Sequence, residues 1–365
     1  MKKLFVFALF GLLAAPALRA QQLWRSEIGI QGGFARVKPA GTGLNDRIDL
    51  FDLPGLDIAP ARPSYTAVFA VIPWSPKLAI EPSFSVSQTQ QTLNTTLADV
   101  GLRLDYALSP KLYGAAGLTL GHQSGTALEE TQLGALIAGG YRMHLTGSLR
   151  GRVEARINLM SKTDRYGPRD VYALLFGLSA TSGGGTSRRA AAGPARSLWR
   201  QVIGVSAGYS QIHGIRNNAA ANNFTMLSFL GQGSRSLMPP TLFAIFPIGK
   251  RLAVEPGFDL HRLQQAGPGS LTSATSNIAA RLDYAIHGGW YAAAGGDAQY
   301  VKITGTPAYA RPGGVVAAGY RFGLSDELGG RIELSHTMFP ARRTNPRFPA
   351  ANVTGISLGL TVPLQ

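Results

Sequence analysis

The chain has 365 residues, of which 45 are glycine, 45% are hydrophobic and only 15% are charged. The formal net charge is +15 and there is no cysteine, which excludes disulfides, cysteine-ligated zinc and thiol catalysis. A chain this apolar is unlike a disordered one. The composition favours a β protein with one polar and one apolar face.

The chain begins with a predicted export signal. Lys2 and Lys3 precede an apolar run that ends near Leu13, and small residues continue to Ala20. A basic start, a short apolar stretch and small residues are the pattern of a cleaved signal peptide. We therefore expect residues 1–20 to be removed and the protein to be exported.

The rest of the chain contains an internal duplication. Five short motifs recur in the same order at spacings of 174 to 179 positions; residues 103–107, for example, recur as 281–285. Collinear matches at nearly one spacing indicate a duplicated unit. The predicted organisation is a signal peptide, a first repeat, a Gly/Ala/Arg linker and a second repeat, at residues 1–20, 21–182, 183–197 and 198–365.

Polar and apolar residues alternate within each repeat. Over residues 149–159, polar side chains at even positions alternate with small or apolar ones at odd positions, which places the two sets on opposite faces of a strand. We count eight such segments per repeat, joined alternately by long loops and short turns. This is the pattern of a transmembrane, antiparallel, up-and-down β-barrel with periplasmic turns. The predicted fold class is all-β, with two tandem eight-stranded barrels favoured by the long linker; one sixteen-stranded barrel is the alternative.

Two strand–turn–strand stretches, residues 102–110 and 319–327, resemble those of a known family. It is the family of eight-stranded outer-membrane barrels that includes the outer-membrane protein A-like and opacity-type domains. The resemblance covers residues 22–182 and 198–365. It implies a location in a Gram-negative outer membrane and the barrel-assembly machinery as a partner during biogenesis.

The inward faces of the predicted strands carry charges of both signs. An eight-stranded barrel is just wide enough for side chains to fill it, and charges buried there must pair. Each repeat supplies three acids and three arginines at equivalent inward positions. We predict an ion-pair network inside each barrel, with a charged pore lining or gate as the alternative. Its members are Glu81, Arg103, Asp105, Arg142, Arg152 and Glu154, then Glu255, Arg281, Asp283, Arg321, Arg331 and Glu333.

All four tryptophans and several tyrosines lie near the short-turn ends of the predicted strands. Aromatic girdles mark membrane–water boundaries. The sequence therefore predicts a set of membrane-interface aromatics: Trp24, Trp74, Tyr106, Trp199, Tyr284 and Trp290.

The sequence favours a structural or surface-interaction role through two long loops, residues 39–63 and 214–238. A porin or small-solute channel is the first alternative, and a lipid-active outer-membrane enzyme is the second. The six histidines form no metal or catalytic motif, and phosphate-binding glycine motifs are missing, so we predict no catalytic residue, metal or cofactor.

The expected partners are outer-membrane lipid and lipopolysaccharide. Arg342, Arg343 and Arg347 lie on the long-loop side, where guanidinium groups suit lipopolysaccharide phosphates. Export, and the lack of a single basic stripe, argue against nucleic acid in spite of the positive charge.

Overall fold

The structure is a computed structural model that describes most of the two repeats. The described residues are 23–39, 48–53, 68–90, 95–125, 128–146, 149–163, 168–181, 199–215, 224–229, 242–265, 272–305, 307–323, 328–340 and 350–364. The predicted signal peptide, the linker 183–197, most of both long loops, and Arg342, Arg343 and Arg347 lie outside the described residues.

The first repeat forms a closed antiparallel barrel of eight strands. Each strand pairs with the next, and the last pairs back with the first along Glu27–Pro39, which closes the ring. In order around the barrel, the strands are β1 (Glu27–Pro39), β3 (Val68–Pro73), β4 (Leu78–Gln90), β5 (Thr95–Ala107), β6 (Leu112–Gly125), β7 (Leu128–Thr146), β8 (Leu149–Met160) and β9 (Arg169–Thr181).

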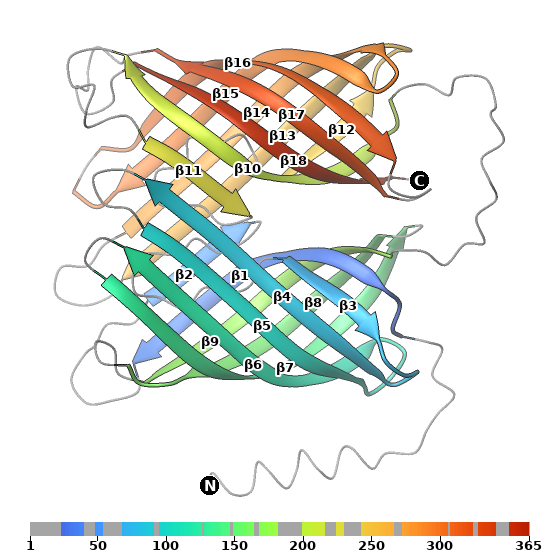
Figure 1. The fold of residues 1–365 in the computed structure, drawn as a ribbon, viewed down its shortest axis with the longest axis vertical. Helices are drawn as coiled ribbons and strands as arrows, with labels where there is room; N and C mark the ends of the chain where they lie inside the picture. The colour runs from blue at the N-terminus through green and yellow to red at the C-terminus, as the bar shows by residue number, and fades with distance from the viewer. Residues whose placement is uncertain are drawn as a thin grey trace, which may run out of the picture.

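The second repeat forms an equivalent barrel. Its last strand pairs back with its first over the full length of both strands. The predicted fold of two eight-stranded barrels is therefore confirmed (Figure 1). The strands are β10 (Val202–Ile215), β12 (Leu242–Pro247), β13 (Leu252–Gln265), β14 (Thr272–His287), β15 (Trp290–Ile303), β16 (Tyr309–Gly323), β17 (Gly329–Phe339) and β18 (Ala350–Pro363).

Local sequence explains the tight turns at one end of the first barrel. Ser75 Oγ accepts hydrogen bonds from the backbone amides of Lys77 and Leu78, at 3.3 and 3.0 Å. Ser109 Oγ does the same at the next turn, for the amides two and three residues later. In both turns the serine is followed by Pro-Lys-Leu, so the same turn chemistry is used twice.

Two short strands that the sequence did not predict join the two barrels. They are β2 (Ile48–Leu53) and β11 (Phe224–Phe229), one in each long loop. Strand β2 pairs with β1 of its own barrel on one edge and with β13 of the other barrel on the other edge. Strand β11 pairs with β10 on one edge and with β4 on the other. We call β2 and β11 the exchange strands.

The exchange strands make the pairing different at the two ends of the molecule. On the turn side, β3 and β12 close two separate rings. On the loop side, the pairings run from β1 through β2 to β13, and from β10 through β11 to β4, so they follow one circuit through both barrels. Figure 1 shows β11 at the waist between the barrels, alongside β4.

The outer walls of the barrels are apolar and the inner faces are polar. On β5, Val100, Leu102 and Leu104 point outward and are about half exposed, whereas Arg103 and Asp105 point inward and are buried. This inside-out arrangement is that of a barrel that faces lipid. In the described part of the chain, no helix is long and apolar enough to cross a membrane.

Candidate functional site: the barrel interiors

The inner face of the first barrel holds four arginines and four acids in ion-pair contact. Arg103 lies at the centre, because it contacts Glu81 at 3.0 Å, Asp105 at 2.8 Å and Glu154 at 2.7 Å. Register explains the first contact, since Glu81 and Arg103 are opposite each other on β4 and β5. The other pairs are Arg152–Glu81 at 2.5 Å, Arg156–Glu154 at 2.7 Å, Arg142–Glu27 at 2.6 Å and Arg150–Glu27 at 3.4 Å.

The second barrel repeats this network with three arginines and three acids. Arg281 contacts Glu255 at 2.8 Å and Glu333 at 2.5 Å, and its Nε lies 3.2 Å from Asp283. The remaining contacts are Arg331–Glu255 at 2.7 Å, Arg321–Asp283 at 3.0 Å and Arg321–Glu255 at 3.4 Å. The structure thus places all twelve residues of the predicted interior set in ion-pair contacts within their own barrels.

The two networks differ by one matched pair of charges. The first barrel has Glu27 and Arg156, and the equivalent positions of the second barrel hold Val202 and Ser335. Without a partner equivalent to Glu27, Arg321 contacts Asp283 and Glu255 instead. An acid and a base are absent together, so positive and negative charges stay equal in each network, as the cost of an unpaired buried charge requires.

Sequence reasoning did not find Glu27. The inward charges predicted in the first repeat contained one more arginine than acids, once Arg156 was counted, and this surplus was the available signal. Glu27 Oε2 accepts hydrogen bonds from Arg142 at 2.6 Å and from the Ser179 hydroxyl at 2.7 Å. It therefore ties the start of β1 to strands β7 and β9.

A layer of aromatic rings closes the turn-side end of each network. In the first barrel, Trp24 and Tyr113 meet edge to face with centroids 5.7 Å apart, and the Arg152 guanidinium lies 3.6 Å from the centre of the Phe69 ring. The second barrel repeats both features, with Trp199 and Tyr291 at 5.9 Å and Arg331 over Phe243 at 3.5 Å. Alanines surround the rings and leave room for them.

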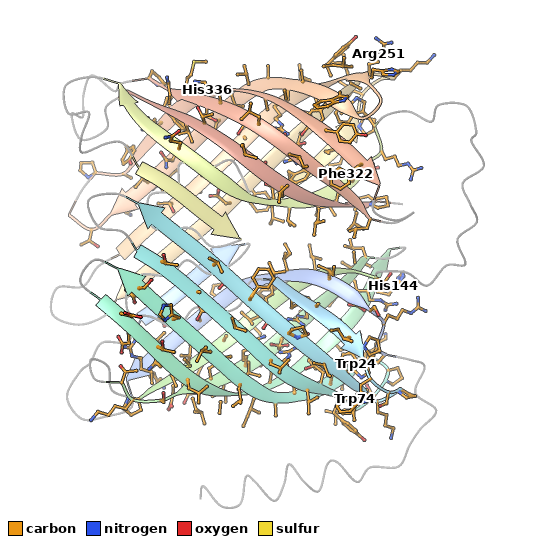
Figure 2. The ribbon with its side chains drawn as sticks, in the orientation of Figure 1. Trp24, Trp74, His144, Arg251, Phe322 and His336 are labelled. Carbon is orange, nitrogen blue, oxygen red and sulfur yellow. The ribbon has the colours of Figure 1, made fainter. Side chains whose placement is uncertain are left out.

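The tyrosines connect the aromatic layer to the ion pairs. The Tyr113 hydroxyl donates a 2.5 Å hydrogen bond to Glu154, and the Tyr291 hydroxyl donates an equal one to Glu333. Glycine makes each ring fit, since a Cβ at Gly140 would lie 2.5 Å from the Tyr113 ring, and one at Gly319 would lie 2.6 Å from Tyr291. Rings and charges therefore form one packed plug in each barrel, visible among the side chains of Figure 2.

The prediction that Trp24 and Trp199 face the membrane boundary is wrong. Both are buried inside their barrels, whereas Trp74 and Trp290 are exposed, at 68% and 57%. The tryptophans at 24 and 199 precede β1 and β10, so the alternation of the strand does not extend to them. Figure 2 shows Trp24 within the barrel end and Trp74 outside it.

The two tyrosines of the predicted aromatic set lie at the turn-side rim. Tyr284 is exposed and its hydroxyl accepts a hydrogen bond from Arg251 at 3.2 Å, while the Lys77 ammonium lies 6.0 Å from the centre of the Tyr106 ring, which is half-buried. Amphipathic rings beside cationic side chains suit a boundary between hydrocarbon and water.

Toward the loop side, the second barrel has two acids that the first lacks. Asp259 accepts hydrogen bonds from the backbone and side-chain amides of Asn277, both at 3.0 Å. Asp297 is buried on the same inner face, and no described residue gives its Oδ1 a hydrogen bond. The equivalent positions of the first repeat are Ser85 and Thr119. Within the described ranges, no group of three or more histidines and acids is placed to hold a metal ion.

Comparisons with known proteins find likeness only among solved structures. No protein-family model matches the chain, and no curated protein matches it. The monoaromatic hydrocarbon channel CymD is 10% identical, with 97% of this chain and 92% of that chain covered and a TM-score of 0.32. A FadL homologue from Pseudomonas aeruginosa is 11% identical, with coverages of 93% and 90% and a TM-score of 0.28. The translocator domain of the autotransporter NalP from Neisseria meningitidis is 9% identical, with coverages of 100% and 95% and a TM-score of 0.27. At these scores we take nothing from them about activity or ligands.

Proposed function

We propose that this chain is an integral outer-membrane protein of two plugged barrels, with a structural and surface-interaction role and no catalytic one. The observation that carries the proposal is the packed plug of ion pairs and aromatic rings in each barrel. The proposal keeps the resemblance to outer-membrane protein A-like and opacity-type domains, because each barrel has eight strands.

Support for the membrane comes from the distribution of polarity. Large apolar side chains about half exposed cover the outer walls on many strands, including Leu118, Leu282 and Leu358. A soluble protein rarely exposes apolar patches larger than a few hundred Å². Strands that alternate apolar-out and polar-in satisfy both the lipid and the buried charges.

Support for closed barrels comes from the depth of the plug. The acids and arginines at its centre, such as Glu81, Arg152 and Glu333, are almost completely inaccessible to solvent. A permeant ion would have to separate buried ion pairs, and breaking such a pair costs several kcal/mol. With the lumens filled, we assign surface interactions to the loop-side ends. Lipopolysaccharide phosphates are the expected contacts for Arg342, Arg343 and Arg347.

A channel is the second candidate, and the loop-side pairings favour it. The exchange strands link both barrels into one circuit there, which is the pairing that a single wide barrel needs. In a channel of this kind, the same arginines and acids would line the pore and set its selectivity.

Single-channel conductance in a planar bilayer tests the proposal. We expect the inserted wild-type protein to show no stable openings. We expect openings in the double variant Tyr113→Ala/Tyr291→Ala, which removes a ring from both plugs. Trp74→Ala, which changes an exposed aromatic on the outer wall, is the matched control and stays closed. A large and stable wild-type conductance would overturn the plugged-barrel proposal in favour of the channel.

A further inference from the structure

The outer walls of the two barrels face each other on the turn side. The facing strands are equivalent in the two repeats, because β1 and β9 close the first barrel where β10 and β18 close the second. Outward side chains that would otherwise contact lipid meet across this gap. Ile30 illustrates it, since only 9% of this side chain is exposed, whereas Leu102 on a free wall is 58% exposed.

Two apolar contact clusters hold the walls together at different depths. One joins Ile30, Val68 and Leu178 of the first barrel to Val205 and Leu242 of the second. The other lies nearer the turns and joins Leu149 and Ala180 to Val362, Ile203, Leu328 and Leu364. Residues of both clusters also line a cavity of about 400 Å³ between the walls, a size typical of small-ligand sites.

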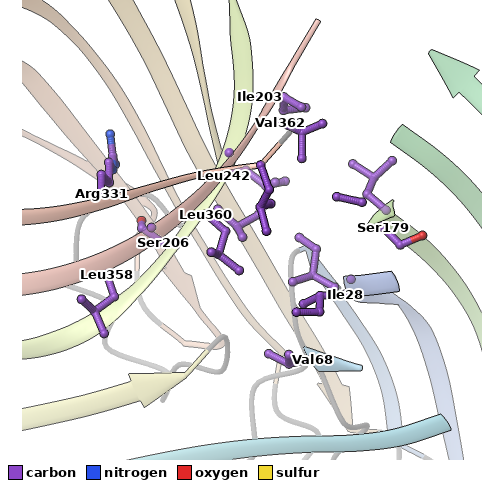
Figure 3. A pocket seen from close by; sticks show the side chains of 18 of the residues that line it. Ile28, Val68, Ser179, Ile203, Ser206, Leu242, Arg331, Leu358, Leu360 and Val362 are labelled. Atoms are coloured by element: carbon purple, nitrogen blue, oxygen red, sulfur yellow. The ribbon is translucent and has the colours of Figure 1, made fainter. Parts of the chain in front are cut away.

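The lining of this inter-barrel cavity is almost entirely aliphatic (Figure 3). Ile28, Leu358 and Leu360 are among the side chains that face it. Two polar residues of the lining have their polar ends inside the barrels: Ser179 donates its hydroxyl to Glu27, and Arg331 is paired with Glu255. Water needs two to four polar partners in a buried site, and this lining does not supply them.

We propose that the inter-barrel cavity binds one acyl chain of a phospholipid, an inference that rests on the membrane location proposed above. An empty gap would forfeit van der Waals contacts along both walls. The cavity continues the lipid-facing surface of both barrels, so acyl chains are the apolar molecules that reach it. It lies on the turn side, which is the periplasmic side of such barrels, and this favours a phospholipid over lipopolysaccharide.

The acyl chain completes the packing between the barrels. The exchange strands join them by backbone pairing on the loop side, whereas on the turn side the contact consists of side-chain clusters around the cavity. A bound chain between these clusters adds contact to both walls. The two barrels then move as one body in the membrane.

Native mass spectrometry of the full-length protein, purified from membranes and exchanged into a mild detergent, tests this proposal. We expect the wild type to retain one phospholipid per chain. Leu360→Trp places an indole in the cavity from the second barrel, and Leu178→Trp does so from the first, so both variants lose the lipid. Leu282→Trp enlarges an outward side chain on a free wall and retains it.

The outcomes separate this proposal from the membrane proposal. Each variant is first reconstituted into phosphatidylcholine vesicles and checked for the heat-dependent gel mobility of a folded barrel. A wild type that inserts but carries no phospholipid would overturn the lipid site alone. Equal retention by the two cavity variants and the control would overturn it too. A wild type that fails to insert would overturn the membrane location, and the lipid site with it.

Discussion

Replacing Glu333 by glutamine tests whether the plug of the second barrel depends on charge pairing. The Glu333 carboxylate accepts hydrogen bonds from both terminal nitrogens of Arg281, at 2.8 and 2.5 Å, and from the Tyr291 hydroxyl at 2.5 Å. An amide of nearly the same shape keeps one acceptor oxygen but loses the charge. The interior network of three arginines and three acids then has one arginine too many.

The size of the effect follows from the partners that remain. Removing one member of a buried ion pair costs about 3–5 kcal/mol, because the other charge stays buried without compensation. Arg281 keeps contacts with Glu255 at 2.8 Å and Asp283 at 3.2 Å, so we expect the lower end of this range. About 3 kcal/mol corresponds to a factor of roughly 10² in the folding equilibrium constant.

Urea unfolding of vesicle-inserted protein, followed by tryptophan fluorescence, measures this change in the free energy of unfolding. Asp49→Asn is the matched control. It breaks the exposed Arg36–Asp49 pair at 2.7 Å, whose side chains are 46% and 30% exposed, and costs under about 1 kcal/mol. Adding Arg281→Met to Glu333→Gln removes the surplus charge and recovers part of the loss. A Glu333→Gln effect no larger than that of Asp49→Asn would refute the reasoning.

Three further predictions concern the exchange strands, the buried acid and the glycines of the plug. Ser87→Cys with Ser228→Cys, which are register partners on β4 and β11, forms a disulfide on oxidation in this cysteine-free chain; peptide mass spectrometry detects it, and its absence would count against the exchange pairing. Asp297→Asn raises the free energy of unfolding by about 1–3 kcal/mol, because it removes a buried charge with an unbonded oxygen; a lower value in urea unfolding would contradict this. Gly319→Ala lowers stability, since its Cβ would lie 2.6 Å from an aromatic ring, whereas at Gly323 a Cβ meets no described atom within 4 Å. Equal urea midpoints for Gly319→Ala and Gly323→Ala would disprove the steric explanation.

Sequence by itself determined the architecture of each repeat, because the relevant signals are local. Alternation with period two says which face of a strand each side chain takes, and it needs no knowledge of distant residues. It placed Arg103, Asp105 and Glu154 on an inner face, and the duplication repeated that placement in the second barrel. The tight turns were readable for the same reason, since a serine followed by proline and lysine carries its own turn chemistry.

Only the tertiary structure decided which groups meet. A strand face does not specify a partner across the lumen, so the contact of Arg142 with Glu27, 115 positions earlier, follows from barrel closure. Trp24 lies inside because the chain enters the barrel mouth before the strand pattern begins. Strand β2 finds an equivalent free edge on β4 of its own barrel and on β13 of the other, since the repeats are alike. Local pattern therefore cannot choose between them; the packing of the two barrels made that choice, and it also created the apolar cavity between their walls.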